Sequence, residues 1–392
     1  MTPDDRDADD RDAAVTGDLR VVGGVAATGR PVEVTIVGGR VVPDPPPGDV
    51  PSYDATGCYV LPGLIDLQVN GAGGHDLTDQ PDRLWDVAAA LARFGVTAFA
   101  PTVISSAPEA RVRALAAFQA GPSPGWAGAV PLGLHYEGPM IAAGRKGAHP
   151  ERWLVPPSPA VIDGWSRDEG VLMATLAPEL PGALDVIRDL AARGVLVSVG
   201  HTEATAAQVE AAVDAGARLV THLGNAMPPL LAREPGPIGV ALGGSRLVAG
   251  VIADGHHLDP LTLSLAWRAL GPDRFLAVSD TTAALGLPDG PARLGDQDVI
   301  VSAGTVRLST GTLAGSAASL PQCLRTLVAT TGCALGEAVR SATATPAALV
   351  GDPVRGSLRP GGRGDVTVLD QALDVVATIV GGRVVYARNG GY

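Results

Sequence analysis

Runs of apolar residues with the length of buried strands alternate with helical patterns through most of this chain of 392 residues. The strand candidates are residues 64–70, 96–102, 129–137, 171–177, 195–201, 218–223, 247–253 and 275–280. Helical patterns lie between most of them, at residues 81–94, 108–120, 182–193, 203–216 and 258–270. Eight strands that alternate with helices predict an α/β fold of the (β/α)8 TIM-barrel type. An open doubly wound sheet is the alternative, but no GxGxxG turn follows the first strand.

The two ends of the chain share an identical octet, TIVGGRVV, at residues 35–42 and 378–385. Each copy has the form of a strand, a Gly-Gly turn and a second strand, which is typical of a β-hairpin. We therefore expect both chain ends to build one small β-sandwich domain, with the barrel inserted between its halves. The expected boundaries are a disordered acidic tail at 1–15, the β-sandwich at 16–61 and 352–392, and the barrel at 62–351.

Composition excludes several classes of protein. The net charge of −12 argues against non-specific binding to nucleic acid. A run of about 18 or more apolar residues, the length of a membrane span, is absent from the sequence. The acidic start MTPDDRDADDRD also lacks the basic and apolar parts of a signal peptide. Three scattered cysteines (Cys58, Cys323 and Cys333) do not make a disulfide framework, so we expect a cytoplasmic protein.

Residues 195–227 read as a strand, a helix and a second strand, with a histidine at the end of each strand. Thr205 and Gln208 fit a capping box at the start of the helix. A unit of this length is a right-handed crossover between neighbouring parallel strands. It places His201 and His222 side by side at the carboxyl edge of the sheet, which favours a metal between two imidazoles.

Two carboxylates are predicted to lie at the same edge. The third strand ends at Glu137 and the eighth ends at Asp280. Glutamate with two histidines is a common ligand set for a catalytic zinc ion, with a fourth position open to water. A further carboxylate beside that water is placed to act as a general base. We therefore expect Glu137, His201 and His222 to hold a metal and Asp280 to move protons.

Longer motifs carry a resemblance to a known family. They are PGLIDLQVNGAGG (62–74), HYEGPM (135–140), KGAHP (146–150), GHTEAT (200–205), THLGNAM (221–227), REPG (233–236), ADGHHLD (253–259), VSDTTA (278–283) and TLAGS (312–316). The motifs follow one another in the order found in the family. Through them the chain resembles the amidohydrolase superfamily and, within it, the N-acetylglucosamine-6-phosphate deacetylase family. The resemblance implies a β-sandwich from both chain ends packed on a barrel. It also implies hydrolysis of the acetamide of N-acetylglucosamine 6-phosphate to glucosamine 6-phosphate and acetate.

The resemblance matches Glu137, His201 and His222 to the family's metal ligands and Asp280 to its catalytic aspartate. Superfamily members often carry His-x-His on the first strand for another metal, where this chain has Gln68-Val69-Asn70. Neutral amides are poor ligands for a divalent cation. We therefore expect one divalent ion per subunit, most simply zinc, although iron accepts the same ligands.

The resemblance also implies how the substrate is held. It assigns the phosphate to Asn225, the main-chain N–H of Ala226 and Arg233. His257 matches a histidine that contacts the substrate, and His149 matches one that lies over the sugar and the scissile amide, with a catalytic role. The resemblance further implies a homodimer, in which Arg233 and His257 can be contributed to the active site of the neighbouring chain.

Two further polar residues within these motifs are expected to have structural roles. His135, two residues before Glu137, is expected to be a hydrogen-bonded histidine of the barrel interior. Ser316 is expected to cap the helix that follows it. Two other functions stay open, namely an amidohydrolase that acts on another N-acyl sugar or a cyclic amide, and an inactive scaffold of the same fold.

Overall fold

The structure is a computed structural model that describes residues 16–43 and 50–388. The predicted acidic tail at 1–15 lies outside the described residues. Within those two ranges, the structure contains no helix that has both the length and the apolar character needed to cross a membrane.

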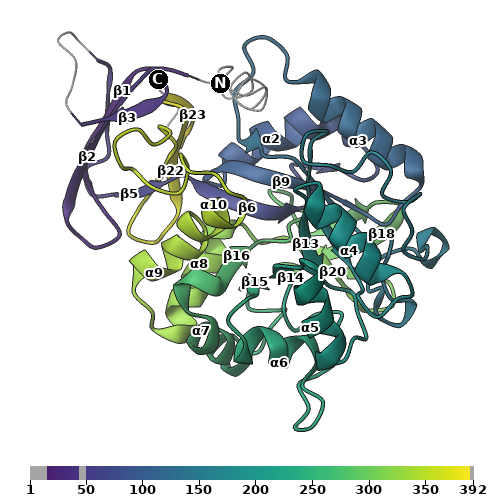
Figure 1. Ribbon diagram of the computed structural model, residues 1–392. Coiled ribbons are helices and arrows are strands. Elements are labelled where there is room, and N and C mark those ends of the chain that lie inside the picture. Colours follow the sequence, from purple (N-terminus) through teal and green to yellow (C-terminus); the bar gives the residue numbers. More distant parts are fainter. Residues whose placement is uncertain (1–15, 44–49, 389–392) are drawn as a thin grey trace.

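A barrel of parallel strands surrounded by helices forms the centre of the molecule (Figure 1). Its strands are β6 (Leu64–Val69), β9 (Val96–Ile104), β11 (Leu134–Glu137), β12 (Val171–Leu176), β13 (Leu196–Val199), β14 (Leu219–Val220), β15 (Val248–Ile252) and β16 (Phe275–Val278). Neighbours pair in parallel from β9 to β16, and β6 pairs with β9. Beyond the strand ends the Asn70 N–H donates to the Thr281 carbonyl over 2.7 Å, which closes the circle. The (β/α)8 prediction is confirmed.

The predicted third strand, residues 129–137, is interrupted. It forms β10 (Val130–Pro131) and β11, which both pair with β9. Residues 132 and 133 between them belong to neither strand, although the Leu132 N–H still donates to the Phe99 carbonyl of β9 over 2.8 Å. Its apolar character has a simple cause, since both faces of the strand are buried. Tyr136 faces outward and packs its ring 4.6 Å from that of Trp165, whereas His135 and Glu137 face the barrel interior.

The helices that surround the barrel are α2 (Leu84–Ala92), α3 (Pro108–Ala120), α4 (Ala183–Ala192), α5 (Ala206–Ala215), α6 (Gly236–Gly243), α7 (Pro260–Arg274), α8 (Leu320–Thr331), α9 (Leu335–Ser341) and α10 (Ala344–Leu349). Among them, α2, α3, α4, α5 and α7 match the five predicted helical segments, whereas α6, α8, α9 and α10 were not predicted. Three short 3-10 turns, η1 (Pro81–Arg83), η2 (Ala143–Arg145) and η3 (Glu151–Trp153), lie in the loops. The capping box predicted for α5 is present, because Thr205 and Gln208 exchange hydrogen bonds between side chain and backbone.

Both chain ends contribute to one separate sheet beside the barrel (Figure 1). Its strands are β1 (Leu19–Val25), β2 (Pro31–Val37), β3 (Arg40–Val42), β4 (Ser52–Asp54), β5 (Tyr59–Pro62), β21 (Val366–Leu369), β22 (Val375–Val380) and β23 (Arg383–Ala387). In the order β23-β22-β21-β5-β1-β2-β3, the sheet mixes strands from the two chain ends, and β4 pairs with β1. It encloses its own core, which includes Val21, Ile36 and Val368.

The repeated octet forms a hairpin at each edge of this sheet, as predicted. Gly38 and Gly39 have φ of 55° and 78°, and Gly381 and Gly382 have φ of 53° and 81°. Two successive positive φ values are the geometry of a type I′ turn, which glycine adopts without strain. The two turns meet through Gly17, which donates to the Gly381 carbonyl and accepts from the Gly39 N–H. The sheet therefore curls until its two edges are joined by the chain at residue 17.

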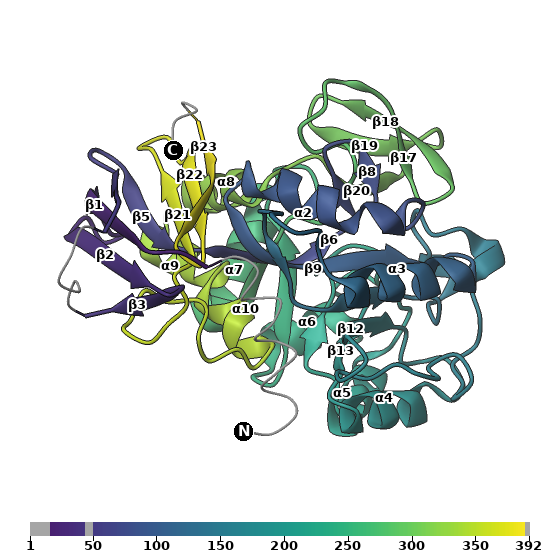
Figure 2. The same ribbon diagram turned by 90° about the horizontal axis from the view of Figure 1, so that it is seen from above.

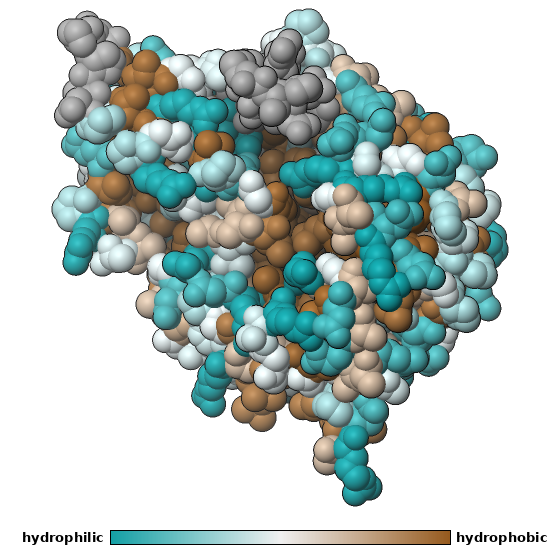
Figure 3. All heavy atoms as spheres, viewed as in Figure 1, coloured by the Kyte–Doolittle hydropathy of each residue, from teal (hydrophilic) through white to brown (hydrophobic). Residues whose placement is uncertain are grey.

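A small antiparallel sheet, absent from our sequence predictions, lies between β16 and α8. It comprises β17 (Gly290–Leu294), β18 (Gln297–Ser302), β19 (Thr305–Leu308) and β20 (Leu313–Ser316), and we call it the insert. Figure 2 shows it at one end of the barrel, away from the sheet of the chain ends. Leu294 and Val306 of the insert pack with Ile104 and Ala148 of the barrel loops. On the face turned away from the insert, apolar residues gather over the barrel centre within a largely hydrophilic surface (Figure 3).

Candidate active site

A cavity of about 290 Å³ lies at the carboxyl ends of the barrel strands, which we call the barrel pocket. It is lined by most of the predicted site residues, namely Glu137, His149, His201, His222, Asn225, Ala226, His257 and Asp280. Asn70 and the unpredicted Arg145 also line it, as do Leu294 and Leu313 of the insert. The insert therefore forms part of the pocket wall.

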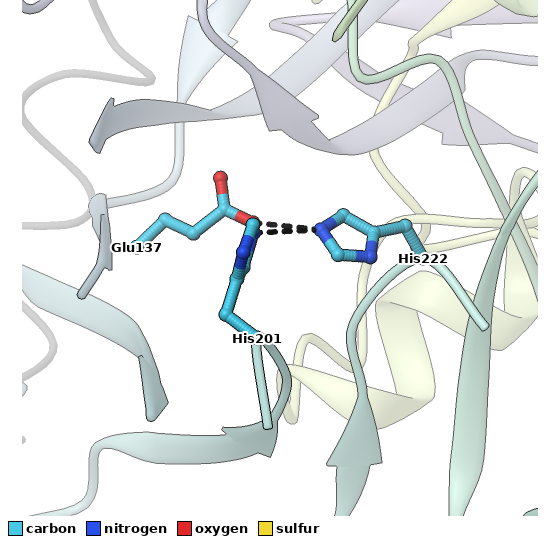
Figure 4. A group of neighbouring side chains, drawn as sticks. All are labelled: Glu137, His201 and His222. Carbon is cyan, nitrogen blue, oxygen red and sulfur yellow. Dashed lines mark hydrogen bonds and ion pairs between the residues drawn. The ribbon is translucent and has the colours of Figure 1, made fainter. Parts of the chain in front are cut away.

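Glu137, His201 and His222 point toward one another from β11 and from the ends of β13 and β14 (Figure 4). The Nε2 atoms of His201 and His222 lie 3.3 and 3.1 Å from Glu137 Oε1, and 3.1 Å from each other. A tetrahedral site with metal–ligand bonds of about 2.0 Å has edges of about 3.3 Å. The three atoms have this spacing, so the cluster could hold a metal ion.

The hydrogen bonds around His201 support the same conclusion. Its Nδ1 lies 2.8 Å from the carbonyl oxygen of Arg145, which can only accept. Nδ1 therefore carries a proton, which leaves Nε2 as the ring nitrogen available to bind a metal. Burial alone would raise the pKa of Glu137, but the hydrogen bonds and charges of the two histidines hold that pKa well below its ordinary value.

Four of the predicted site residues, Ala226 among them, have unusual backbone conformations, and three of the four follow barrel strands. His201, His222 and Asp280 have φ of 49°, 31° and 51°, in the left-handed region that residues other than glycine seldom adopt. Each such residue costs on the order of 1–3 kcal/mol and persists only where the surroundings impose it. At His201 and Asp280 the carbonyls accept hydrogen bonds from Ala142 and Ser316, each over 2.8 Å. Strained backbone at three strand ends is typical of a functional site.

Asp280 lies after β16, with its carboxylate held by Asn70. The Asn70 Nδ2 donates to Asp280 Oδ1 over 2.7 Å. Burial, together with the charge of Glu137, raises the pKa of Asp280 to about 8. Gln68 has a matching contact, because its Nε2 donates to Glu137 Oε1 over 3.2 Å. The two amides that replace the His-x-His pair therefore each donate to one carboxylate of the site.

His149 faces the metal cluster across the pocket. Its Nε2 lies 3.9 Å from Glu137 Oε2, and its ring centroid lies 4.4 Å from that of His201. The main-chain N–H of Ser105 donates to His149 Nδ1 over 3.3 Å, and the Ser105 Oγ lies 2.8 Å from the same atom. Since Nδ1 accepts, the proton of the neutral ring is on Nε2. Burial holds the pKa of His149 well below its ordinary value, so it is a neutral donor.

The residues assigned to the substrate separate into two groups. Asn225, Ala226 and His257 line the barrel pocket of their own chain. Arg233 does not, because it lies on the exposed segment between β14 and α6, which projects at the bottom of Figures 1 and 3. Leu230 and Leu231 on this segment are 48% and 55% exposed.

Sequence analysis missed three residues that support the site. They are Ser105 behind His149, Arg145 beside His201, and Asp254, whose Oδ2 lies 2.8 Å from His257 Nδ1. Asp254 stands inside the motif ADGHHLD, so its contact with His257 could have been expected from that motif. Ser105 and Arg145 have no comparable signal, because their contacts depend on how the loops fold back.

The two structural interpretations have different outcomes. His135 is fully buried and lies within hydrogen-bond distance of Thr102 and Thr175, which confirms a histidine of the barrel interior. The prediction for Ser316 is wrong, because α8 begins at Leu320 and Ser319, three residues after Ser316, caps it. The Ser316 hydroxyl instead donates to the Ser279 carbonyl over 2.6 Å and ties β20 to the end of β16.

Comparison with known proteins identifies the class. The model of the amidohydrolase family matches residues 59–385, which include the whole barrel and strands from both chain ends. The chain therefore belongs to the amidohydrolase family.

Named relatives are more specific. The human N-acetylglucosamine-6-phosphate deacetylase is 39% identical over 349 residues, which cover 85% of each chain. The enzyme of that name from Bacillus subtilis (strain 168) is 34% identical over 335 residues, covering 83% of this chain and 84% of the relative. A mutant of the Mycobacterium smegmatis deacetylase, solved with N-acetyl-D-glucosamine-6-phosphate, superposes with a TM-score of 0.84 at 35% identity, and the match covers 95% of this chain and all of that one.

Proposed function

We propose that this protein hydrolyses the acetamide of N-acetylglucosamine 6-phosphate to glucosamine 6-phosphate and acetate, a step of amino-sugar catabolism and recycling. The observation that carries the proposal is the arrangement of Glu137, His201 and His222 with Asp280 and the neutral donor His149 around one pocket. It is supported by relatives of one activity that match this chain over about 85% of its length.

We propose that Glu137, His201 and His222 hold one divalent ion per chain, most simply zinc. When bound, such an ion polarises an amide carbonyl and lowers the pKa of water. The amide donors of Gln68 and Asn70 oppose a second ion, because a positively polarised N–H cannot coordinate a cation. Gln68 donates to Glu137 Oε1, the oxygen that faces the two imidazoles, and Asn70 donates to Asp280 Oδ1.

The protein's own groups then have defined tasks. Asp280 accepts a proton from the attacking water and delivers it to the departing amine, which is a poor leaving group until it is protonated. One Asp280 oxygen is held by Asn70, so the other is left for this transfer. The Nε2–H of His149 donates to the carbonyl oxygen as negative charge develops there.

We propose that the substrate's phosphate is held by groups of the pocket wall next to the metal cluster, where the Asn225 N–H donates to the His222 carbonyl over 3.0 Å. Ala226 has φ of 51°, and its N–H makes no hydrogen bond within the described part of the chain. We propose that this N–H, the Asn225 amide and His257 bind the sugar phosphate in their own chain. Asp254 holds His257 in place through its Nδ1.

We further propose that the protein is a homodimer in which Arg233 reaches the phosphate of the neighbouring site. The exposed apolar side chains of Leu230 and Leu231 on the same projecting segment favour its burial against a second copy. His257 lines the pocket of its own chain, so we assign the contribution to the partner's site to Arg233 alone. A cytoplasmic location rests on the scattered cysteines, which are all free among the described residues.

The proposal is tested by product analysis. The zinc-loaded protein should release equal amounts of acetate and glucosamine 6-phosphate from N-acetylglucosamine 6-phosphate. Metal-stripped protein and the Asp280→Asn variant are the matched controls, and both products should form at least about a hundredfold more slowly with them. Turnover of a cyclic amide such as dihydrouracil, with no acetate from the sugar phosphate, would place the protein among other amidohydrolases. No turnover by a metal-loaded protein would favour an inactive scaffold.

A further inference from the structure

Arg145 is the one lysine or arginine among the described residues that line the barrel pocket. This is notable because the proposed substrate carries a phosphate, and phosphate sites in proteins combine main-chain donors with at least one cation. Arg233, the cation suggested by the motifs, lies on an exposed segment outside the pocket of its own chain. The pocket therefore has an arginine of its own to which no role has been assigned.

The backbone of Arg145 is fixed by the metal cluster. It ends the turn η2, and its carbonyl accepts from His201 Nδ1 over 2.8 Å. Its N–H donates to the Ala142 carbonyl over 2.9 Å, and the Ala142 N–H donates to the His201 carbonyl over 2.8 Å. The segment 142–145 is thus bonded at both of its ends to His201, the second residue after β13. A side-chain substitution at Arg145 leaves all of these main-chain bonds in place.

The guanidinium of Arg145 is only loosely paired. Its Nε is buried without a hydrogen bond, and the nearest carboxylate oxygen, Glu203 Oε1, lies 3.8 Å away. The two side chains are 36% and 56% exposed, so this ion pair contributes little to stability. An arginine in this state can turn toward an anionic ligand at low cost, and its planar fork matches a phosphate group.

Arg145 also lies close to the main-chain donors proposed for the phosphate. Glu203 directly follows Thr202, whose N–H donates to the Ala226 carbonyl over 3.1 Å. The chain 202–203 therefore connects the Arg145 guanidinium to the turn at Asn225 and Ala226. Arg145, Asn225 and Ala226 all line the barrel pocket.

We infer that Arg145 binds the phosphate of the substrate within its own chain, together with Asn225 and the Ala226 N–H. This inference rests on the proposed function and adds a specificity-determining residue to it. Arg145 selects for the phosphorylated sugar, and it does so whether or not a second chain supplies Arg233.

The inference is tested first by binding, which does not depend on turnover. Titration calorimetry compares glucosamine 6-phosphate with glucosamine on the zinc-loaded protein and on Arg145→Gln, Arg145→Lys and Lys146→Ala. Arg145→Gln should weaken binding of the sugar phosphate by about ten- to a hundredfold and leave binding of glucosamine within about twofold. Arg145→Lys keeps the charge and should lose about fivefold or less. Lys146, the only lysine of the chain, is the neighbouring cation outside the pocket lining, and its loss should change neither affinity.

The same variants are then compared in acetate release. Arg145→Gln should lower kcat/KM for N-acetylglucosamine 6-phosphate by about ten- to a hundredfold, mainly through KM, with an unchanged zinc content. The inference would be overturned if Arg145→Gln bound glucosamine 6-phosphate within threefold of the wild type. It would also be overturned if this variant lost equal affinity for glucosamine 6-phosphate and for glucosamine. Phosphate-dependent binding that requires Arg145, without any acetate release, would support the inference and refute the proposed function.

Discussion

Asn70 donates a hydrogen bond to Asp280 across 2.7 Å, and so joins the residue after β6 to the second residue after β16. The Asn70 N–H closes the barrel at the same place by donating to Thr281. One residue therefore closes the ring of strands and holds the carboxylate that we propose moves protons. Gln68, two residues earlier, donates to Glu137 in the same way.

The metal content follows from these two amide contacts. Each amide presents an N–H donor where a ligand to a second ion would have to present a lone pair. We therefore expect about one divalent ion per chain at full activity. Elemental analysis of the purified active protein measures this ratio. Two tightly held ions per active subunit would show that the amides do not exclude a second metal.

Replacing Asp280 by asparagine tests its role as a base. The amide keeps the size of the side chain but cannot accept the proton of the attacking water. Turnover of Asp280→Asn should fall by at least about a hundredfold while the metal stays bound. Acetate release and metal content are measured on the same sample. Loss of the metal together with activity would mean that Asp280 is primarily a metal ligand and not a general base.

The raised pKa of Asp280 predicts that protons are released when the metal binds. Burial and the charge of Glu137 raise that pKa to about 8, so the carboxyl of the metal-free protein carries a proton at pH 7. A cation bound beside it favours the ionised form, lowers the pKa and expels this proton. Calorimetric titration with Zn²⁺ in buffers of different ionisation enthalpy counts the protons. Asp280→Asn should release about one proton fewer than the wild type when zinc binds. An unchanged number of released protons would contradict the prediction.

Ser105 is expected to act through His149. Its hydroxyl lies 2.8 Å from His149 Nδ1 and helps to keep the ring proton on Nε2. Ser105→Ala removes one hydrogen bond worth about 1 kcal/mol and should lower kcat by about fivefold with KM nearly unchanged. Ser105→Thr keeps the hydroxyl and should retain activity. In a His149→Gln background Ser105→Ala should have no further effect, and additive losses would assign Ser105 to the fold.

Arg233→Ala tests the second phosphate contact. A partly desolvated contact between a guanidinium and a phosphate contributes roughly 2–4 kcal/mol, so kcat/KM for the phosphorylated sugar should fall by about thirty- to a thousandfold. Activity on N-acetylglucosamine should barely change. An equal loss on both sugars would mean that Arg233 supports the fold.

Hybrid dimers separate contacts within a chain from contacts between chains. A mixture of Arg233→Ala and Asp280→Asn chains should regain activity, because the intact Asp280 site receives Arg233 from its partner. A mixture of Arg145→Gln and Asp280→Asn chains should not, because each site keeps its own defect. Restoration by the second mixture would place Arg145 in the neighbouring site.

The barrel and its metal cluster could be predicted from the sequence for one physical reason. Strands buried on both faces are continuous apolar runs, and polar residues that end such runs stand out. His201, His222, Glu137 and Asp280 all follow runs of this kind, so parallel topology brings them to one edge.

Other parts of the site are not encoded in such runs. The strands of the insert are half-exposed and short, and in β18 buried and exposed residues alternate within a polar segment. The contacts of Ser105 and Arg145 arise from loops that fold back over the pocket. Arg233 lies on an exposed segment outside the pocket of its own chain, so its proposed phosphate contact depends on an assembly of two chains.

The most direct test of the account is the ratio of kcat/KM for N-acetylglucosamine 6-phosphate to that for N-acetylglucosamine, measured as acetate release by the zinc-loaded wild-type protein. In our proposal Arg145, Arg233 and the Ala226 N–H all bind a group that only the phosphorylated sugar carries. Charge-assisted contacts of roughly 1.5–3 kcal/mol each predict a ratio of at least about a hundred. A ratio near one, or faster hydrolysis of the unphosphorylated sugar, would contradict the proposed substrate.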